Sequence, residues 1–139
     1  MSEENVESVR SFYQADPPSE RAMRAFFETL DEEIEFDASA SRSLPEYRTL
    51  IRGKDAVIDY YRHWWGTWWE DVVIEPIEIR RVDDDRVLGT DRQRGRGRGS
   101  GAPFEIQITY ITTFRAGKVV RMQFFDSRAE ALEAAGLEE

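Results

Sequence analysis

Two side chains in the C-terminal third of the sequence could exchange protons with a bound molecule, the phenol of Tyr110 and the carboxyl of Asp126. A carboxyl group buried in an apolar cavity acquires a raised pKa and becomes a usable acid or base near neutral pH. A phenol beside it can hydrogen-bond the oxygen of a developing enolate. The sequence has no cysteine, a single histidine and no recognisable nucleophile motif or metal-ligand cluster. We therefore expect acid–base chemistry on an apolar ligand, with no metal and no cofactor.

The position of Tyr110 follows from three β-type segments within residues 86–125, which glycine-containing stretches separate. This pattern predicts an antiparallel meander with a tight hairpin at Ala116-Gly117. In the middle segment apolar and polar residues alternate, so Tyr110 shares a face with Ile108, whereas Ile111 is an exception on the other face. A sheet with one apolar face must cover that face. We expect Tyr110 to point towards the cover.

The last β-type segment places Asp126 on the same side, because it continues the alternation of Met122 and Phe124. The alternative for Tyr110 is a core tyrosine whose hydroxyl reaches water or a carbonyl group. The alternative for Asp126 is a strand-end residue that stabilises the N-terminus of the helix following Ser127.

The first β-type segment carries a polar pair and then a glycine-arginine repeat. Asp91 and Gln93 share the alternation of Val87 and could form a further polar pair within the sheet. The repeat Gly95-Arg-Gly-Arg-Gly-Ser-Gly101 lies between strands and lacks the spacing of a dinucleotide-binding loop. It is typical of a glycine-rich hairpin with solvated arginines, although those arginines could also bind a ligand carboxylate or phosphate.

Helical spacing predicts three helices before the meander, over residues 2–14, 19–30 and 53–69. The third is unusually aromatic and contains four tryptophans, Trp64, Trp65, Trp68 and Trp69. They cannot all face one way, because neighbours on a helix lie about 100° apart. Either Trp64 or Trp68 stacks against a flat apolar ligand, or the tryptophans fill the core and an interface. The predicted ligand-binding residues are Phe27, Tyr61, Trp64, Trp68, Met122 and Phe124.

The remaining segments complete an α+β domain. We expect a short strand at 34–37, a loop over 38–51, a strand over 72–82 and a last helix from Ser127 to Gly136. Helices come first and strands cluster later, which predicts helices on one face of a curved sheet. The 139 residues are expected to form a single domain, 1–139.

Charge and composition limit the classes of partner that this protein is expected to have. The formal net charge of −9 argues against nucleic acid and anionic membranes as partners. No apolar run approaches the roughly 18 residues that a membrane span needs. The lack of cysteine and of a signal-peptide pattern at the N-terminus favours a cytoplasmic protein. The expected partner is a small hydrophobic molecule.

Three stretches resemble the SnoaL-like branch of the NTF2-like superfamily. They are Ile51-Arg52-Gly53-Lys54 with the preceding Tyr47-Arg48, the glycine-arginine repeat, and the closing segment from Gly117-Lys-Val-Val-Arg-Met-Gln-Phe-Phe-Asp126 to Gly136. The resemblance covers nearly the whole chain. It implies a cone-shaped α+β barrel with a pocket between a curved, mixed but mostly antiparallel sheet and the helices, often as a homodimer. The superfamily includes polyketide cyclases, ketosteroid isomerase, dehydratases and non-catalytic binding modules, so fold alone does not give function.

The resemblance also suggests roles for individual residues. By similarity to ketosteroid isomerase the base would fall on Phe36 or Asp37, and the tyrosine that binds the enolate oxygen on Phe12 or Tyr13. Asp37 alternates away from Phe36, which would point it off the apolar face. His63 is the histidine that could serve as an auxiliary acid, as in SnoaL-like cyclases, or it is an ordinary helix histidine.

Two functional hypotheses follow. In the first, a cyclase-like or isomerase-like enzyme uses Asp37 or Asp126 as base, Tyr13 or Tyr110 as hydrogen-bond donor and His63 as auxiliary acid. In the second, the domain binds a small hydrophobic ligand, or another copy of itself, without catalysis. A carboxyl and a hydroxyl group converging in an enclosed pocket would favour the first hypothesis.

Overall fold

The computed structural model of the chain describes residues 2–40, 50–63, 66 and 69–137. Within these residues there are four helices and six strands. The helices are α1 (Ser2–Gln14), α2 (Glu20–Glu28), α3 (Lys54–His63) and α4 (Arg128–Ala135). The strands are β1 (Leu30–Asp37), β2 (Leu50–Arg52), β3 (Trp69–Arg81), β4 (Arg86–Gly97), β5 (Pro103–Arg115) and β6 (Lys118–Phe125).

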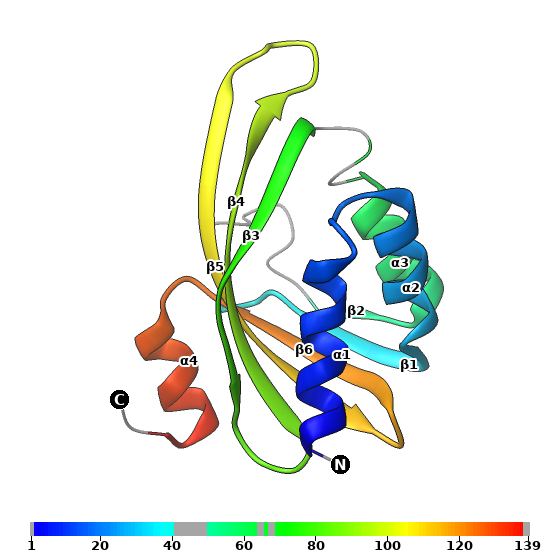
Figure 1. Cartoon of the computed structure of the whole chain (residues 1–139), viewed down its shortest axis with the longest axis vertical. Helices are drawn as coiled ribbons and strands as arrows, with labels where there is room; N and C mark the ends of the chain where they lie inside the picture. Colours follow the sequence, from blue (N-terminus) through cyan, green and yellow to red (C-terminus); the bar gives the residue numbers. More distant parts are fainter. Residues whose placement is uncertain (1, 41–49, 64–65, 67–68, 138–139) are drawn as a thin grey trace.

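The described strands form one open sheet in the order β2-β1-β6-β5-β4-β3. Strands β1 and β6 are parallel, and every other pair is antiparallel. Strands β4, β5 and β6 are the predicted meander, which is confirmed. Figure 1 shows α1, α2 and α3 on one side of this sheet and α4 on the other. None of the described helices is long and apolar enough to cross a lipid bilayer.

Local sequence signals set three of the helix ends. The Ser19 hydroxyl accepts a hydrogen bond of 3.1 Å from the Ala22 N–H at the start of α2. The Ser127 hydroxyl accepts one of 3.2 Å from the Glu130 N–H at the start of α4. Each bond satisfies an N–H group that the first helical turn leaves without a partner. Gly136 ends α4 with φ of 76°, a left-handed conformation that favours glycine.

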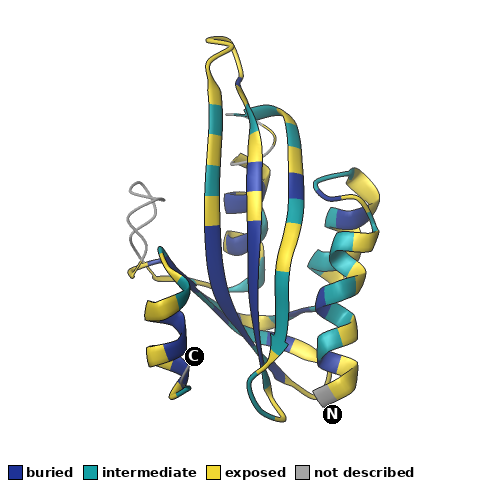
Figure 2. Ribbon diagram, turned by 60° about the vertical axis from the view of Figure 1, so that its left-hand side comes forward, coloured by how far each residue is buried: buried dark blue, intermediate teal, exposed yellow. Residues whose placement is uncertain are grey.

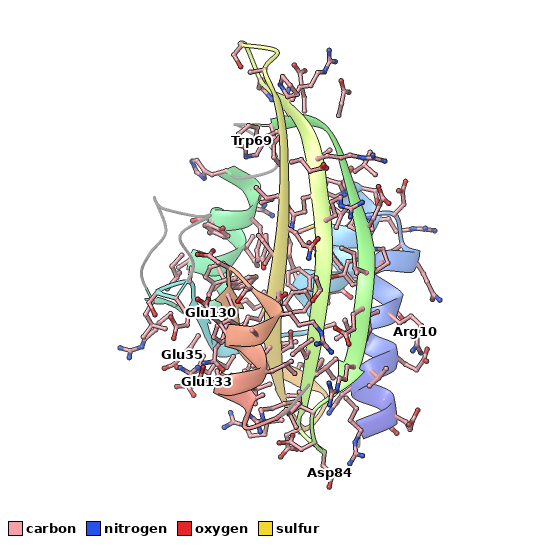
Figure 3. All side chains as sticks on the ribbon, turned by 90° about the vertical axis from the view of Figure 1, so that its left-hand side faces the viewer. Arg10, Glu35, Trp69, Asp84, Glu130 and Glu133 are labelled. Atoms are coloured by element: carbon pink, nitrogen blue, oxygen red, sulfur yellow. The ribbon has the colours of Figure 1, made fainter. Side chains whose placement is uncertain are left out.

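The sheet has an apolar layer on each face. The larger layer lies under α1, α2 and α3 and includes Ile34, Phe36, Val57, Tyr60 and Phe124. The smaller layer lies under α4 and is made of Leu88, Ile111, Phe125, Ala131, Leu132 and Ala135. Figure 2 shows the buried residues concentrated in the part of the long strands that lies between these helices, with more exposed residues towards the β4–β5 hairpin. Figure 3 looks onto the second face, with α4 in front of the strands and its exposed Glu130 and Glu133 labelled.

The second layer explains why Ile111 broke the predicted alternation. Ile111 is completely buried on the α4 side, opposite the face of Tyr110. Because α4 needs an apolar platform, β5 carries an apolar residue there. The exception is therefore part of a second core.

Three predicted boundaries differ from the structure. Strand β1 begins at Leu30 rather than at residue 34, and Leu50–Arg52 forms β2 where a loop was expected. Strand β2 has only three residues, too few to show an alternation, and it pairs with Glu35–Asp37 of β1. Trp69 is the first residue of β3 and not part of a helix, because it pairs with Gly97 and its ring packs 4.1 Å from that of Phe104.

Candidate functional site

A cavity of about 270 Å³ lies between the helix-facing side of the sheet and α1, α2 and α3. This volume is close to the lower end of the range for small-molecule pockets. Its walls are mostly apolar and aromatic, with Phe12 and Phe26 from the helices and Phe36, Phe114 and Phe124 from the strands. Among the described residues that line it, Asp91 is the one that carries a carboxyl group.

Strand alternation places Asp91 inside. Val87, Gly89, Asp91 and Gln93 occupy alternate positions of β4, and all four are buried. Asp91 is only 4% exposed. The polar pair noted in the sequence therefore faces the cavity, where Asp91 and Gln93 form part of the wall.

Asp91 belongs to a chain of hydrogen bonds that joins three elements. The Tyr13 hydroxyl, on α1, donates to Asp91 Oδ2 at 2.8 Å. The Tyr110 hydroxyl, on β5, lies 2.5 Å from the Tyr13 hydroxyl. Gln93 Nε2 donates to Asp91 Oδ1 at 3.3 Å. Both carboxyl oxygens thus have a neutral protein partner, and the chain ends at Tyr110 on the cavity wall.

Burial controls the protonation of this cluster. It raises the pKa of Asp91 to about 6, against the opposing effect of the hydrogen bonds from Tyr13 and Gln93. Burial also raises the pKa of Tyr13, Tyr110 and Tyr61 above the ordinary phenol value. The three phenols therefore stay protonated at neutral pH, while Asp91 titrates close to it. A carboxyl group with such a pKa is suited to both accepting and returning a proton.

A glycine makes room for the Tyr110 ring. Gly89 on β4 is directly opposite Tyr110 on β5. A Cβ atom added at Gly89 would lie 2.4 Å from the Tyr110 hydroxyl oxygen, closer than real Cβ contacts allow. The missing side chain at Gly89 therefore lets the Tyr110 ring lie across β4 and reach Tyr13.

Five of the sequence-predicted site residues line the cavity. They are Tyr13, Tyr61, Tyr110, Met122 and Phe124. Phe27 instead packs against Tyr61, with 6.3 Å between ring centroids, and lines a separate groove between α2 and α3. Tyr61 lines both the cavity and this groove, whereas Phe27 lines the groove alone. Trp64 and Trp68 lie outside the described residues.

Neither carboxyl group that the sequence favoured as a base lines the cavity. Asp37 accepts hydrogen bonds from Ser39 and pairs with Arg121 at 3.3 Å. Although burial raises the pKa of Asp37, these Ser39 and Arg121 contacts leave it below its ordinary value, which makes a weak base. For Asp126, the alternation fails because β6 ends at Phe125 and the chain turns towards α4.

His63 is also absent from the cavity wall. It is exposed at the end of α3, where its Nδ1 lies 2.9 Å from the Asp59 carbonyl oxygen. No group of three or more histidine, aspartate and glutamate side chains among the described residues could hold a metal ion. Among the described residues, the ionisable groups that line the cavity are Asp91 and the phenols of Tyr13, Tyr60, Tyr61 and Tyr110. Asp91, Tyr13 and Tyr110 form one hydrogen-bonded chain.

The sequence contained the signal for Asp91 without revealing its importance. A carboxyl group at an inward strand position is unusual, because burying a charge without a cation is unfavourable. The alternation of β4 marked this position, but it could not show that Tyr13, far away in the sequence, would bind it.

Comparison with known proteins places this chain in a family. The model of the SnoaL-like domain family matches residues 9–122. Among curated protein sequences, no significant match is found.

Solved structures share the fold at low sequence identity. A candidate SnoaL-like polyketide cyclase from Jannaschia sp. CCS1 is 17% identical, with a TM-score of 0.73 over 99% of this chain and 95% of that one. An NTF2-like protein of unknown function from Burkholderia pseudomallei is 19% identical, with a TM-score of 0.72 over 94% and 95%. TerC, crystallised with polyporic acid, is 16% identical, with a TM-score of 0.69 over 96% and 98%. The expected NTF2-like α+β fold is confirmed, and the chain belongs to the SnoaL-like domain family.

Proposed function

We propose that this protein is an acid–base catalyst that acts on a small, mostly apolar carbonyl compound. The observation that carries the proposal is the hydrogen-bonded chain from Asp91 through Tyr13 to Tyr110 at the wall of an apolar cavity. Asp91 takes up and returns the proton, in place of Asp37 or Asp126. Tyr13 and Tyr110 supply the hydroxyl groups that stabilise charge on the ligand oxygen.

The surroundings of Asp91 support this role. A carboxyl group with a pKa of about 6 is ionised in part of the molecules and protonated in the others at near-neutral pH. Proton transfer is most effective when the pKa of the catalytic group is near the working pH. An ion pair with a lysine or arginine would lower the pKa of Asp91, but its side-chain hydrogen-bond donors among the described residues are Tyr13 and Gln93, both neutral.

The tyrosines suit the stabilisation of a ligand oxygen better than a net loss of their own protons to form phenolates. Their pKa values are raised by burial, so their protons are held tightly at neutral pH. Buried hydroxyl groups that are already oriented can stabilise developing negative charge without first reorganising water. The aromatic walls would hold the apolar body of the ligand while the hydroxyl groups orient its oxygen.

The solved relatives support the type of ligand. TerC was crystallised with polyporic acid, and another structure with this fold is described as a candidate polyketide cyclase. By analogy, we propose a cyclic or cyclising carbonyl compound for this chain, small enough for the cavity of about 270 Å³.

Hydrogen exchange next to a ketone tests the proposal without knowledge of the natural substrate. The protein would be incubated with 1-tetralone in D₂O, and deuterium gain at the carbon beside the carbonyl would be followed by NMR. We expect the wild-type protein to accelerate exchange over buffer, and Asp91→Asn to lose at least about 100-fold of that acceleration, as for other general bases. Glu105→Gln is the matched control, because Glu105 is an exposed carboxyl on the outer side of β5. Equal acceleration by wild type and Asp91→Asn would contradict the proposal.

The second proposed function is ligand binding without catalysis. The observation that favours it is that both Asp91 oxygens already accept hydrogen bonds, from Tyr13 and from Gln93, as in a purely structural polar cluster. This function would give saturable binding of 1-tetralone with exchange no faster than in buffer.

A homodimer is proposed for either function. The exposed apolar side chains Val73 and Ile77 on β3 support it, and light scattering during gel filtration tests it.

A further inference from the structure

The direction of the hydrogen bonds in the Asp91–Tyr13–Tyr110 chain depends on where its protons are. Each tyrosine hydroxyl has one proton to donate. When Asp91 is ionised, Tyr13 donates its proton to Asp91 Oδ2, at 2.8 Å. The short contact of 2.5 Å between the two phenols is then made by the Tyr110 proton. In this direction the Tyr110 proton is used inside the chain, and the cluster offers the cavity only lone pairs.

When Asp91 is protonated, the direction reverses. Gln93 Nε2 donates to Asp91 Oδ1, so that oxygen remains an acceptor and the acid proton belongs on Oδ2. Oδ2 then donates to the Tyr13 oxygen, and Tyr13 donates to the Tyr110 oxygen. The Tyr110 proton becomes free to point into the cavity that its ring lines.

We propose that Tyr110 is the residue that meets the ligand, and that the reversed chain makes the cavity select a carbonyl or other oxygen that only accepts hydrogen bonds. This inference rests on the proposed function and specifies its ligand group. Such an oxygen binds most tightly in the reversed direction, so tight binding draws one proton onto Asp91. Removal of an α-hydrogen instead takes place in the weaker complex in which Asp91 is ionised, and it too leaves Asp91 protonated and the chain reversed.

Of Asp91 and the groups that face it, Asp91 is the one whose protonation state changes near neutral pH. Tyr13 faces it from α1, Tyr110 from β5 and Tyr61 from α3, and burial keeps all three phenols protonated. Its neighbour across the β3–β4 ladder is Pro76, which has no titratable group.

The same chain gives a route for proton transfer. Outward transfer breaks the O–H bonds of Asp91, Tyr13 and Tyr110 and forms new ones on Tyr13, Tyr110 and the ligand oxygen. Asp91 becomes a carboxylate, and a ligand enolate becomes an enol, so the total charge is unchanged. The reverse transfer returns the proton to Asp91.

Binding of a matched pair of compounds at different pH values tests the inference. 1-Tetralone carries a carbonyl oxygen, and tetralin is its hydrocarbon counterpart. Both would be titrated into the 139-residue protein and followed by protein NMR. We expect 1-tetralone to bind more weakly by up to about tenfold for each pH unit above the pKa of Asp91, since the binding-competent fraction falls at that rate. Tetralin binding should not change with pH.

Asp91→Asn provides a mimic of the protonated state. The hydrogen bond from Gln93 would orient the new amide at position 91. The oxygen of that amide would accept from Gln93, and its nitrogen would donate to Tyr13. We expect this variant to bind 1-tetralone with the affinity of the low-pH wild type at every pH. Tyr110→Phe should bind 1-tetralone no better than tetralin, and Glu105→Gln should keep the wild-type pH profile.

The results separate this inference from the proposed function. Preference for 1-tetralone over tetralin that is independent of pH would overturn the reversal, although hydrogen exchange dependent on Asp91 could still stand. Failure of both compounds to bind the wild type would overturn the inference as well, because it requires a cavity open to an apolar ligand of this size. Loss of exchange with the pH-dependent binding intact would instead refute catalysis alone.

Discussion

The hydroxyl oxygens of Tyr13 and Tyr110 lie 2.5 Å apart, although 97 positions separate the two residues in the sequence. This contact joins the first helix to the centre of the sheet at the wall of the cavity. It also connects Tyr110 to Asp91, because Tyr13 donates to the Asp91 carboxyl group. The candidate site therefore depends on how α1 packs against β4 and β5.

Gly89→Ala should disrupt the site through the Tyr110 ring. The new methyl group would overlap the ring, which must move or push β4 aside. We expect a loss of about 1–3 kcal/mol in the free energy of unfolding, typical of overpacking, and loss of the contact between Tyr110 and Tyr13. Urea unfolding measures the first effect. In a Tyr110→Leu background the same substitution should be much less destabilising, and an equal loss in both backgrounds would contradict the steric explanation.

Tyr13→Phe should raise the pKa of Asp91 above about 6. The Tyr13 hydroxyl stabilises the ionised carboxylate, so its removal favours the protonated form. The measurement is a pH titration of the Asp91 carboxyl carbon by ¹³C NMR. Tyr61→Phe serves as the comparison, because Tyr61 lines the same cavity while its hydroxyl contacts Met122. A fall in the Asp91 pKa in Tyr13→Phe would show that the hydrogen bond is wrongly assigned.

Stability should respond to pH with opposite signs at Asp91 and Asp37. The folded-state pKa of Asp91 is raised, so its protonated form favours folding, and that contribution is lost as the pH rises from about 4 through about 6. The pKa of Asp37 is lowered, so its contribution is present above the unfolded-state pKa and is lost in acid.

Unfolding of Asp91→Asn and Asp37→Asn at acidic and alkaline pH measures this difference. Between about pH 4.5 and pH 8, Asp91→Asn should gain about 2 kcal/mol relative to wild type, the part of a pKa difference of about two units that falls within this range. Asp37→Asn should instead lose stability relative to wild type as the pH rises from about 2 to about 4.5, the range in which Asp37 ionises. The same sign for both variants would contradict the assigned environments.

Ile111→Ala should weaken the fold while leaving the cavity intact. Ile111 is completely buried in the layer under α4, on the opposite face from Tyr110. Its truncation should cost about 2–5 kcal/mol in the free energy of unfolding. The affinity for 1-tetralone, measured well below the melting temperature, should stay within about twofold of wild type. A much larger change in affinity would mean that the two layers are coupled.

Much of the fold could be predicted because its signals are local. The alternation of β5, the caps at Ser19 and Ser127 and the left-handed Gly136 all depend on residues within a few positions of each other. Short β2 and the true end of the third helix could not be located in this way. Strand β2 exists because it pairs with β1, and Trp69 belongs to β3 because it pairs with Gly97.

The site was harder to predict because its parts come from distant segments. Alternation correctly turned Tyr110, Met122 and Phe124 towards the helices, and the family resemblance pointed to Tyr13. The same alternation failed at Asp126, where the strand has ended. Asp91 was marked only as part of a polar pair, since nothing near it in the sequence shows that a helix will enclose it.

The pH dependence of α-hydrogen exchange in 1-tetralone tests the central claim most directly. Wild type should accelerate exchange with an inflection near the Asp91 pKa of about 6. In Asp91→Asn both the acceleration and the inflection should be absent, while Glu105→Gln should keep them. Acceleration with the same inflection in Asp91→Asn would contradict the assignment of Asp91 as the group that exchanges the proton.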